Sequence, residues 1–199
     1  MSLGGSLAAL PMINLPNVLS LSRIVLVPLL MVVLLTKFEG REIVGLQNEY
    51  LALIIFLVAA FTDFLDGFIA RRRKQVTRLG QLLDPAADKI LTSSAFIALV
   101  ELGLMPAWMV VVVIGREFAV SALRGIGALQ NQAISATMSG KVKTTVQIVT
   151  IAALIVVNPV AAVEPFVPFL QWATVLITLY SGSVYFVRFG HLLIQPVDD

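Results

Sequence analysis

Six apolar stretches, each close to the length that crosses a lipid bilayer, dominate this 199-residue chain. An α-helix needs about 20 apolar residues to span the hydrocarbon core. Within that core every backbone polar group must be satisfied inside the protein, which favours helices. The sequence therefore predicts an all-α integral membrane protein, a bundle of six transmembrane helices. The expected spans are residues 17–36, 49–71, 86–103, 106–130, 140–158 and 166–189.

Composition supports this fold class and narrows the chemistry. The chain is 58% hydrophobic and 13% charged, whereas a soluble domain carries about 25% charged residues. A net charge of +2 gives no reason to expect a nucleic-acid partner. The absence of cysteine excludes a disulfide framework, a thiolate metal site and a cysteine nucleophile.

Basic residues are distributed unevenly between the loops that connect the expected spans. On one side, the loop at 158–168 has no Lys or Arg, and that side carries only Lys37 and Arg41. By the positive-inside rule, the opposite side, which includes both termini, is expected to be cytoplasmic. Its basic residues are Arg71, Arg72, Arg73, Lys74, Arg78, Lys89, Lys141, Lys143 and Arg188.

Four of the six aspartates, Asp63, Asp66, Asp84 and Asp88, lie between apolar stretches on the expected cytoplasmic side. A carboxylate near hydrocarbon costs roughly 2.5–3.5 kcal/mol on insertion scales, and four together repel one another. A bound cation would offset both effects. Because the available ligands are all oxygen atoms, a hard divalent ion such as Mg²⁺ or Mn²⁺ is expected.

The spacing of these aspartates suits one shared site. Asp63 and Asp66 are three residues apart and Asp84 and Asp88 are four apart, so each pair shares a helix face. Two antiparallel helices joined by a short loop can direct all four carboxylates toward one pocket. Asp84 also fits a simpler role, because Asp84-Pro85 matches a helix N-cap followed by proline at the first helical position.

Small residues accompany the first aspartate pair. Gly67 and Ala70 can leave room for a ligand beside the helix, or they can serve close helix–helix packing, and the residues alone do not separate these roles. Arg71 directly follows them. The next residues, Arg72, Arg73 and Lys74, are interpreted as topology determinants or a patch for lipid headgroups.

The pattern D-x2-D-G-x2-A-R-x8-G-x3-D-x3-D over residues 63–88 resembles, without departure, the signature of the CDP-alcohol phosphotransferases. These membrane enzymes transfer a phosphatidyl or similar group from a CDP-linked donor to an alcohol, and they too have a six-helix core. The resemblance implies a domain over residues 12–191 with a polar cavity open to the cytoplasm. Residues 1–11 are interpreted as a cloning remnant or upstream extension, and 192–199 as a C-terminal tail.

The resemblance also implies roles for individual residues. Asp63, Asp66 and Asp84 would bind a pair of divalent ions, Mg²⁺ or Mn²⁺, and Asp88 would act both as a ligand and as the general base. The residues that would line the CDP site are Asn17, Gly67, Ala70, Arg71 and Gly80.

A second polar group interrupts the fourth apolar stretch. Arg116 and Arg124 are eight residues apart, a little over two turns, so they share a helix face and suit a phosphate group. The alternative interpretation is that Glu117 simply pairs with a basic neighbour. Lys141 and Lys143 are two residues apart, so at most one of them is expected to face the same pocket.

Three segments, residues 14–23, 115–124 and 140–147, resemble those of the bacterial phosphatidylglycerophosphate synthases, although Ser20 stands where that branch often has threonine. This branch implies transfer of the phosphatidyl group of CDP-diacylglycerol to sn-glycerol 3-phosphate at the bacterial cytoplasmic membrane, and homodimers are typical of it. Arg116, Arg124 and Lys141 or Lys143 would then bind the acceptor phosphate.

Other functions remain open on sequence alone. The acceptor could be inositol phosphate, serine or phosphatidylglycerol. A divalent-cation transporter is an alternative from a different class, although its carboxylates are expected nearer the bilayer midplane and on several spans. A purely structural bundle leaves the spacing of the aspartates unexplained.

Overall fold

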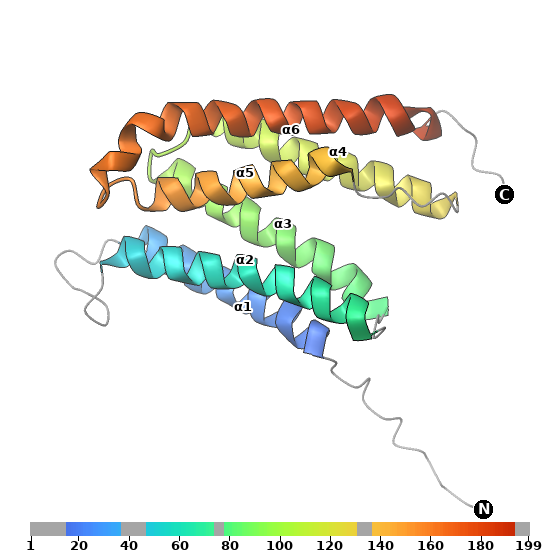
Figure 1. Ribbon diagram of the computed structural model, residues 1–199, viewed down its shortest axis with the longest axis horizontal. Coiled ribbons are helices and arrows are strands. Elements are labelled where there is room, and N and C mark those ends of the chain that lie inside the picture. The colour runs from blue at the N-terminus through green and yellow to red at the C-terminus, as the bar shows by residue number, and fades with distance from the viewer. Residues whose placement is uncertain (1–14, 37–46, 74–77, 131–136, 194–199) are drawn as a thin grey trace, which may run out of the picture.

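The computed structural model describes residues 15–36, 47–73, 78–130 and 137–193, and among these the side chains of 15–20, 63–85, 192 and 193 are left out. The described backbone is helical and contains no strand. Figure 1 shows the six α-helices in chain order. They are α1 (Leu15–Leu35), α2 (Asn48–Arg73), α3 (Arg78–Glu101), α4 (Ala107–Leu129), α5 (Met138–Ile155) and α6 (Val167–Phe189), with short 3₁₀ segments at Ala161–Phe166 and Gly190–Leu193.

Successive helices run in opposite directions, so alternate helix ends meet at the same end of the bundle. In Figure 1 the starts of α1, α3 and α5 and the ends of α2, α4 and α6 point toward the right-hand side. We call this the site end, because it brings together every segment for which a polar role is expected. The other end holds the connections α1–α2, α3–α4 and α5–α6.

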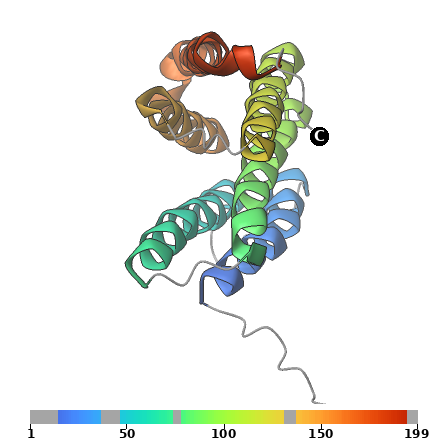
Figure 2. The same ribbon diagram turned by 90° about the vertical axis from the view of Figure 1, so that its right-hand side faces the viewer.

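The helices form two groups that meet along α3 and α5. In the first group α1 packs closely against α2 and α3, and in the second α6 packs against α4 and α5. Figure 2 shows α3, in green, extending from the first group toward the second. Because α5 contacts both α2 and α3, it carries residues of the second group to the helices that bear the aspartates.

The helices are apolar both on the faces that pack together and on the faces that point outward. Buried side chains such as Leu30, Phe56 and Leu99 form one continuous core between the helices. Large apolar side chains also cover the outer surface, with Val25 at 70% and Val111 at 69% exposed. A surface of this kind is suited to lipid rather than water.

One described stretch, Ala161–Phe189, is both long and apolar enough to cross a membrane, and Leu21–Leu35 and Asn48–Thr62 form shorter apolar helices. Helix α4 has comparable length but contains three charged residues, namely Arg116, Glu117 and Arg124. The fold is thus an all-helical bundle of six α-helices in its described parts, consistent with a membrane protein.

Small polar residues allow α5 and α6 to pack closely. The hydroxyl groups of Thr150 and Thr174 lie 2.8 Å apart at a fully buried contact. At the end opposite the site end, the Gln171 amide donates a hydrogen bond to the Leu104 carbonyl at 2.8 Å. Hydroxyl pairs and small residues are common between helices in membranes because they permit close backbone approach.

Five of the six expected helices agree with the structure to within about three residues, but the third begins earlier than expected. Helix α3 starts at Arg78 rather than at residue 86, so Asp84 and Pro85 lie inside it, near the end of its second turn. The interpretation of Asp84 as an N-cap is therefore wrong. The continuous apolar stretch from which the helix was predicted begins only near residue 86. The preceding residues, from Arg78, include polar ones and extend the same helix toward the site end.

Candidate active site

The backbone brings the expected donor and metal residues to the site end. Asp63 and Asp66 lie in the last three turns of α2, and Asp84 and Asp88 lie in the first three turns of α3, which contacts α2. Their neighbours in sequence follow the same placement: Gly67, Ala70 and Arg71 near the end of α2, Gly80 in the first turn of α3, and Asn17 in the first turn of α1. Of all these residues, only Asp88 has a described side chain, so the roles of the others stay predictions.

Asp88 connects this region with the second group of helices. Asp88 is half-buried on α3. Its negatively charged carboxylate attracts the positively charged Lys143 of α5. Thr92, one turn further along α3, donates its hydroxyl hydrogen bond to the Asp88 backbone carbonyl at 3.0 Å. That bond occupies the backbone oxygen and not the carboxylate.

The residue types at the site end suit a hard divalent ion. The four aspartates supply oxygen atoms only, and their backbone positions lie one turn apart on each of two contacting helices. Within the described side chains no group of three or more metal-binding residues occurs, since three of the four carboxylates fall outside them.

A cluster of charged side chains lies between α4 and α5, with Glu117 at its centre. One oxygen of the Glu117 carboxylate, Oε1, accepts hydrogen bonds from Arg116 at 3.3 Å, from Lys143, and from the Gln147 amide at 3.5 Å. The Glu117 and Lys143 side chains are only 13% and 9% exposed. The alternative that Glu117 pairs with a basic neighbour is therefore confirmed, and it pairs with two.

Arg116 and Arg124 lie on one face of α4, as their spacing predicts, and both contact α6. Arg116 donates a hydrogen bond from Nη2 to the Ser181 hydroxyl at 2.8 Å. Arg124 donates from Nη2 to the Tyr185 hydroxyl at 2.7 Å. The two guanidinium carbons lie 5.7 Å and 5.2 Å from the centroid of the Tyr185 ring. The arginines are thus gathered around one aromatic side chain.

The structure separates the two lysines of α5. Lys143 is buried and contacts Glu117, whereas Lys141 is exposed. Of the two lysines, Lys143 is the one that contacts the charged cluster, and its role at an acceptor phosphate stays a prediction. Lys141 does not join the cluster that includes Arg116 and Glu117.

Sequence reasoning missed the α6 side of this cluster. Ser181, Gly182 and Tyr185 contact the arginines but lie in a stretch that reads only as a spanning helix. The available signal was their spacing, since the three residues fall within about one turn of one helix. Arg23 of α1 is a second omission, because its side chain is fully buried, and an arginine inside an apolar helix is costly and usually functional.

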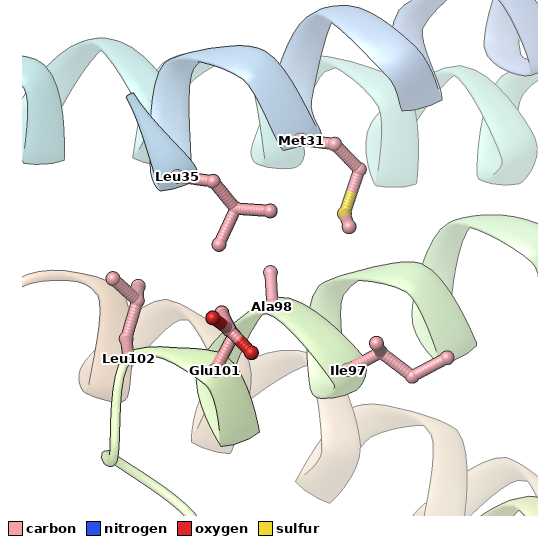
Figure 3. A pocket seen from close by; sticks show the side chains of 6 residues that line it. All are labelled: Met31, Leu35, Ile97, Ala98, Glu101 and Leu102. Carbon is pink, nitrogen blue, oxygen red and sulfur yellow. The ribbon is translucent and has the colours of Figure 1, made fainter. Parts of the chain in front are cut away.

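A cavity of about 370 Å³ lies between α1 and α3 at the end opposite the site end (Figure 3). Its lining residues from Ile97 onward lie at least nine residues, or about 14 Å of helix, from Asp88, which separates the cavity from the polar clusters. Its single charged lining residue is acidic, so it does not suit a phosphate ligand. The lining side chains are Met31, Leu35, Ile97, Ala98, Glu101 and Leu102.

Comparison with known proteins gives the family directly. The sequence model of the CDP-alcohol phosphatidyltransferases matches residues 13–180. The chain belongs to this family.

Two curated relatives carry the same name, CDP-diacylglycerol–glycerol-3-phosphate 3-phosphatidyltransferase. The protein of Bacillus subtilis (strain 168) is 44% identical over 184 residues, covering 89% of this chain and 95% of its own. That of Pectobacterium atrosepticum is 34% identical over 191 residues, covering 92% and 98% respectively. Similarity to enzymes with this name therefore extends over nearly the whole chain.

The different burial of the two lysines leads to a first prediction. Lys143→Ala should lower the free energy of unfolding by about 3 kcal/mol, because it removes a charged partner from the buried Glu117 carboxylate. Lys141→Ala, its matched control, should change that free energy by less than about 0.5 kcal/mol. Thermal unfolding of both purified variants in the same detergent measures the difference. Equal losses of stability would contradict the pairing of Lys143 with Glu117.

Proposed function

We propose that this protein transfers the phosphatidyl group of CDP-diacylglycerol to sn-glycerol 3-phosphate, giving phosphatidylglycerol phosphate and CMP. The primary hydroxyl of the acceptor attacks the lipid-linked phosphorus, a new phosphorus–oxygen bond forms, and the bond to CMP breaks. The observation that carries the proposal is a basic cluster, made of Arg116 and Arg124 on α4 and Lys143 on α5, which α6 contacts. The names of the curated relatives support the same reaction.

The cluster has the charge that a phosphate monoester requires. Arg116 and Lys143 contact the Glu117 carboxylate, and Arg124 lies on the Tyr185 ring that Arg116 also contacts, so these three cations outnumber Glu117 by two positive charges. That excess matches a doubly charged phosphate, whereas an uncharged alcohol needs no such cluster. Among the described residues no group accepts a hydrogen bond from the buried Nε of Arg116.

We assign the role of base to Asp88. It lies on α3, and its negative charge attracts Lys143 of the cluster. An acceptor held at the cluster by its phosphate would extend its hydroxyl end toward α3. Asp88 would then take the hydroxyl proton as the new bond forms. The remaining contributions are orientation of the two substrates and exclusion of water between the helix groups.

The aspartates of α2 and α3 are the residues that would hold divalent metal ions, as the family signature implies. Asp63, Asp66 and Asp84 would act as ligands and Asp88 would serve as a ligand as well as the base. Bound there, the ions would neutralise charge on the pyrophosphate of the donor and make the attacking hydroxyl more acidic. The CDP group would lie against Asn17, Gly67, Ala70, Arg71 and Gly80.

The bundle would lie in the bacterial cytoplasmic membrane with its six helices crossing the bilayer and its site end toward the cytoplasm. The exposed apolar side chains on every helix group support membrane insertion, and the placement of most basic residues at the site end supports the orientation. CDP-diacylglycerol could then enter from the lipid while its nucleotide reaches the polar end. The homodimer stays a prediction.

The reaction is tested by a transfer assay with purified protein in detergent, CDP-diacylglycerol and Mg²⁺. Labelled glycerol 3-phosphate should enter a lipid product with equal release of CMP, and EDTA should abolish both. The control acceptors are inositol phosphate, serine and phosphatidylglycerol. Turnover on one of these and none on glycerol 3-phosphate would overturn the acceptor assignment, and turnover unaffected by EDTA would overturn the metal assignment.

Substitution of Arg124 tests the acceptor site. Arg124→Ala should raise the KM for glycerol 3-phosphate about tenfold to a hundredfold, because a hydrogen bond between charged groups is lost. The KM for CDP-diacylglycerol should change by less than about twofold. Steady-state kinetics with each substrate varied in turn give both constants. An equal rise in both would place Arg124 outside the acceptor site.

Substitution of Asp88 tests the base. Asp88→Asn keeps the size of the side chain but cannot take a proton, so kcat should fall at least about a hundredfold while CDP binding stays measurable by calorimetry. The matched control is Glu101→Gln, the same change at the opposite end of α3, which should keep full activity. Full activity in Asp88→Asn would exclude Asp88 as the general base.

A further inference from the structure

Among the described residues, Tyr185 is the one aromatic side chain whose ring lies against both Arg116 and Arg124. It lies on α6, is 2% exposed, and its ring centroid is within 6 Å of the guanidinium carbons of Arg116 and Arg124. A guanidinium group at this distance from an aromatic ring is attracted by the ring electrons. The ring therefore offsets part of the repulsion between the two cations.

The Tyr185 hydroxyl joins three helices at one atom. It accepts a hydrogen bond from Nη2 of Arg124 at 2.7 Å and another from the backbone N–H of Thr137 at 3.1 Å. Thr137 is the N-cap of α5, and its hydroxyl in turn accepts from the Gly140 N–H at 3.3 Å. Tyr185 thus fixes the start of α5, which carries Lys143, relative to Arg124 on α4.

The preceding turn of α6 holds the other arginine. The Ser181 hydroxyl accepts the hydrogen bond from Arg116. A Cβ added at Gly182 would lie 2.9 Å from the Cγ of Arg116, closer than such atoms pack, so glycine is needed for the arginine to occupy its place. One face of α6 consequently supports both cations and keeps them apart.

We propose that Tyr185 is a positioning residue for acceptor binding, which acts by holding Arg124 and Arg116 in the arrangement that receives the phosphate of glycerol 3-phosphate. The inference rests on the proposed function, since it concerns the same acceptor. Arginine has many rotamers, and ordering it on binding costs affinity. A ring and a hydroxyl that hold two arginines beforehand reduce that cost, so Tyr185 contributes to acceptor affinity without itself touching the reacting atoms.

Kinetics of Tyr185→Phe and Tyr185→Leu test this role. Tyr185→Phe keeps the ring and loses the hydroxyl, and it should raise the KM for glycerol 3-phosphate about tenfold. Tyr185→Leu should raise it further, because the ring is lost as well. For Tyr185→Phe, kcat and the KM for CDP-diacylglycerol should stay within about twofold of the parent values. The matched control is Tyr180→Phe on the exposed face of α6, which should match the parent protein.

A double-mutant cycle with Arg124→Ala separates positioning from general support of the fold. If Tyr185 acts through Arg124, Tyr185→Phe should change the acceptor KM by less than about threefold once Arg124 is absent. Fully additive effects, or an equal rise in both substrate KM values, would overturn the proposal. If Arg124→Ala itself leaves the acceptor KM unchanged, the proposed acceptor site fails instead, so the two failures are distinguishable.

Gly182→Ala provides an independent variant should Tyr185 be required for folding. The added methyl group displaces Arg116 while the Tyr185 ring and hydroxyl stay in place. The KM for glycerol 3-phosphate should rise selectively, as with Tyr185→Phe. An unchanged acceptor KM in a folded Gly182→Ala protein would overturn the arrangement of α6 as the support for the arginines.

Discussion

The shared interaction of Glu117 with Arg116 and Lys143 is the contact on which the second half of the bundle depends. Charged side chains between apolar helices are costly unless they are paired and hydrogen-bonded. One carboxylate oxygen accepts from both cations and from Gln147, which makes the burial of the lysine tolerable. Because Glu117 offsets only one of the two charges that it contacts, and Arg124 lies nearby on Tyr185, the cluster keeps an excess positive charge for a ligand.

The two groups of helices divide the chemistry between them. The aspartate segments lie on α2 and α3 of the first group, and the basic cluster lies on α4, α5 and α6 of the second. Lys143 belongs to the second group but interacts with Asp88 of the first. A donor held by the aspartates and an acceptor held by the cations would therefore meet along this contact, at the polar end of an otherwise apolar bundle.

Much of this architecture could be predicted from sequence, since stretches of about 20 apolar residues leave few alternatives to helices. The same signal failed at the start of α3, where Asp84 and the preceding residues are helical without being apolar. Charged residues such as Arg116 and Arg124 stood out because they interrupt apolar stretches. Tyr185 and Gly182 did not, because both are ordinary within a spanning helix, and their role depends on contacts between helices that no local pattern encodes.

The most direct test is to locate the metal and the acceptor phosphate together in an experimental structure. Crystals grown with Mn²⁺, CDP and glycerol 3-phosphate allow the ion to be found by its anomalous scattering. The account predicts Mn²⁺ between α2 and α3 at Asp63, Asp66, Asp84 and Asp88, with the acceptor phosphate on Arg116, Arg124 and Lys143. Mn²⁺ bound away from these aspartates, or a phosphate bound outside the basic cluster, would contradict it.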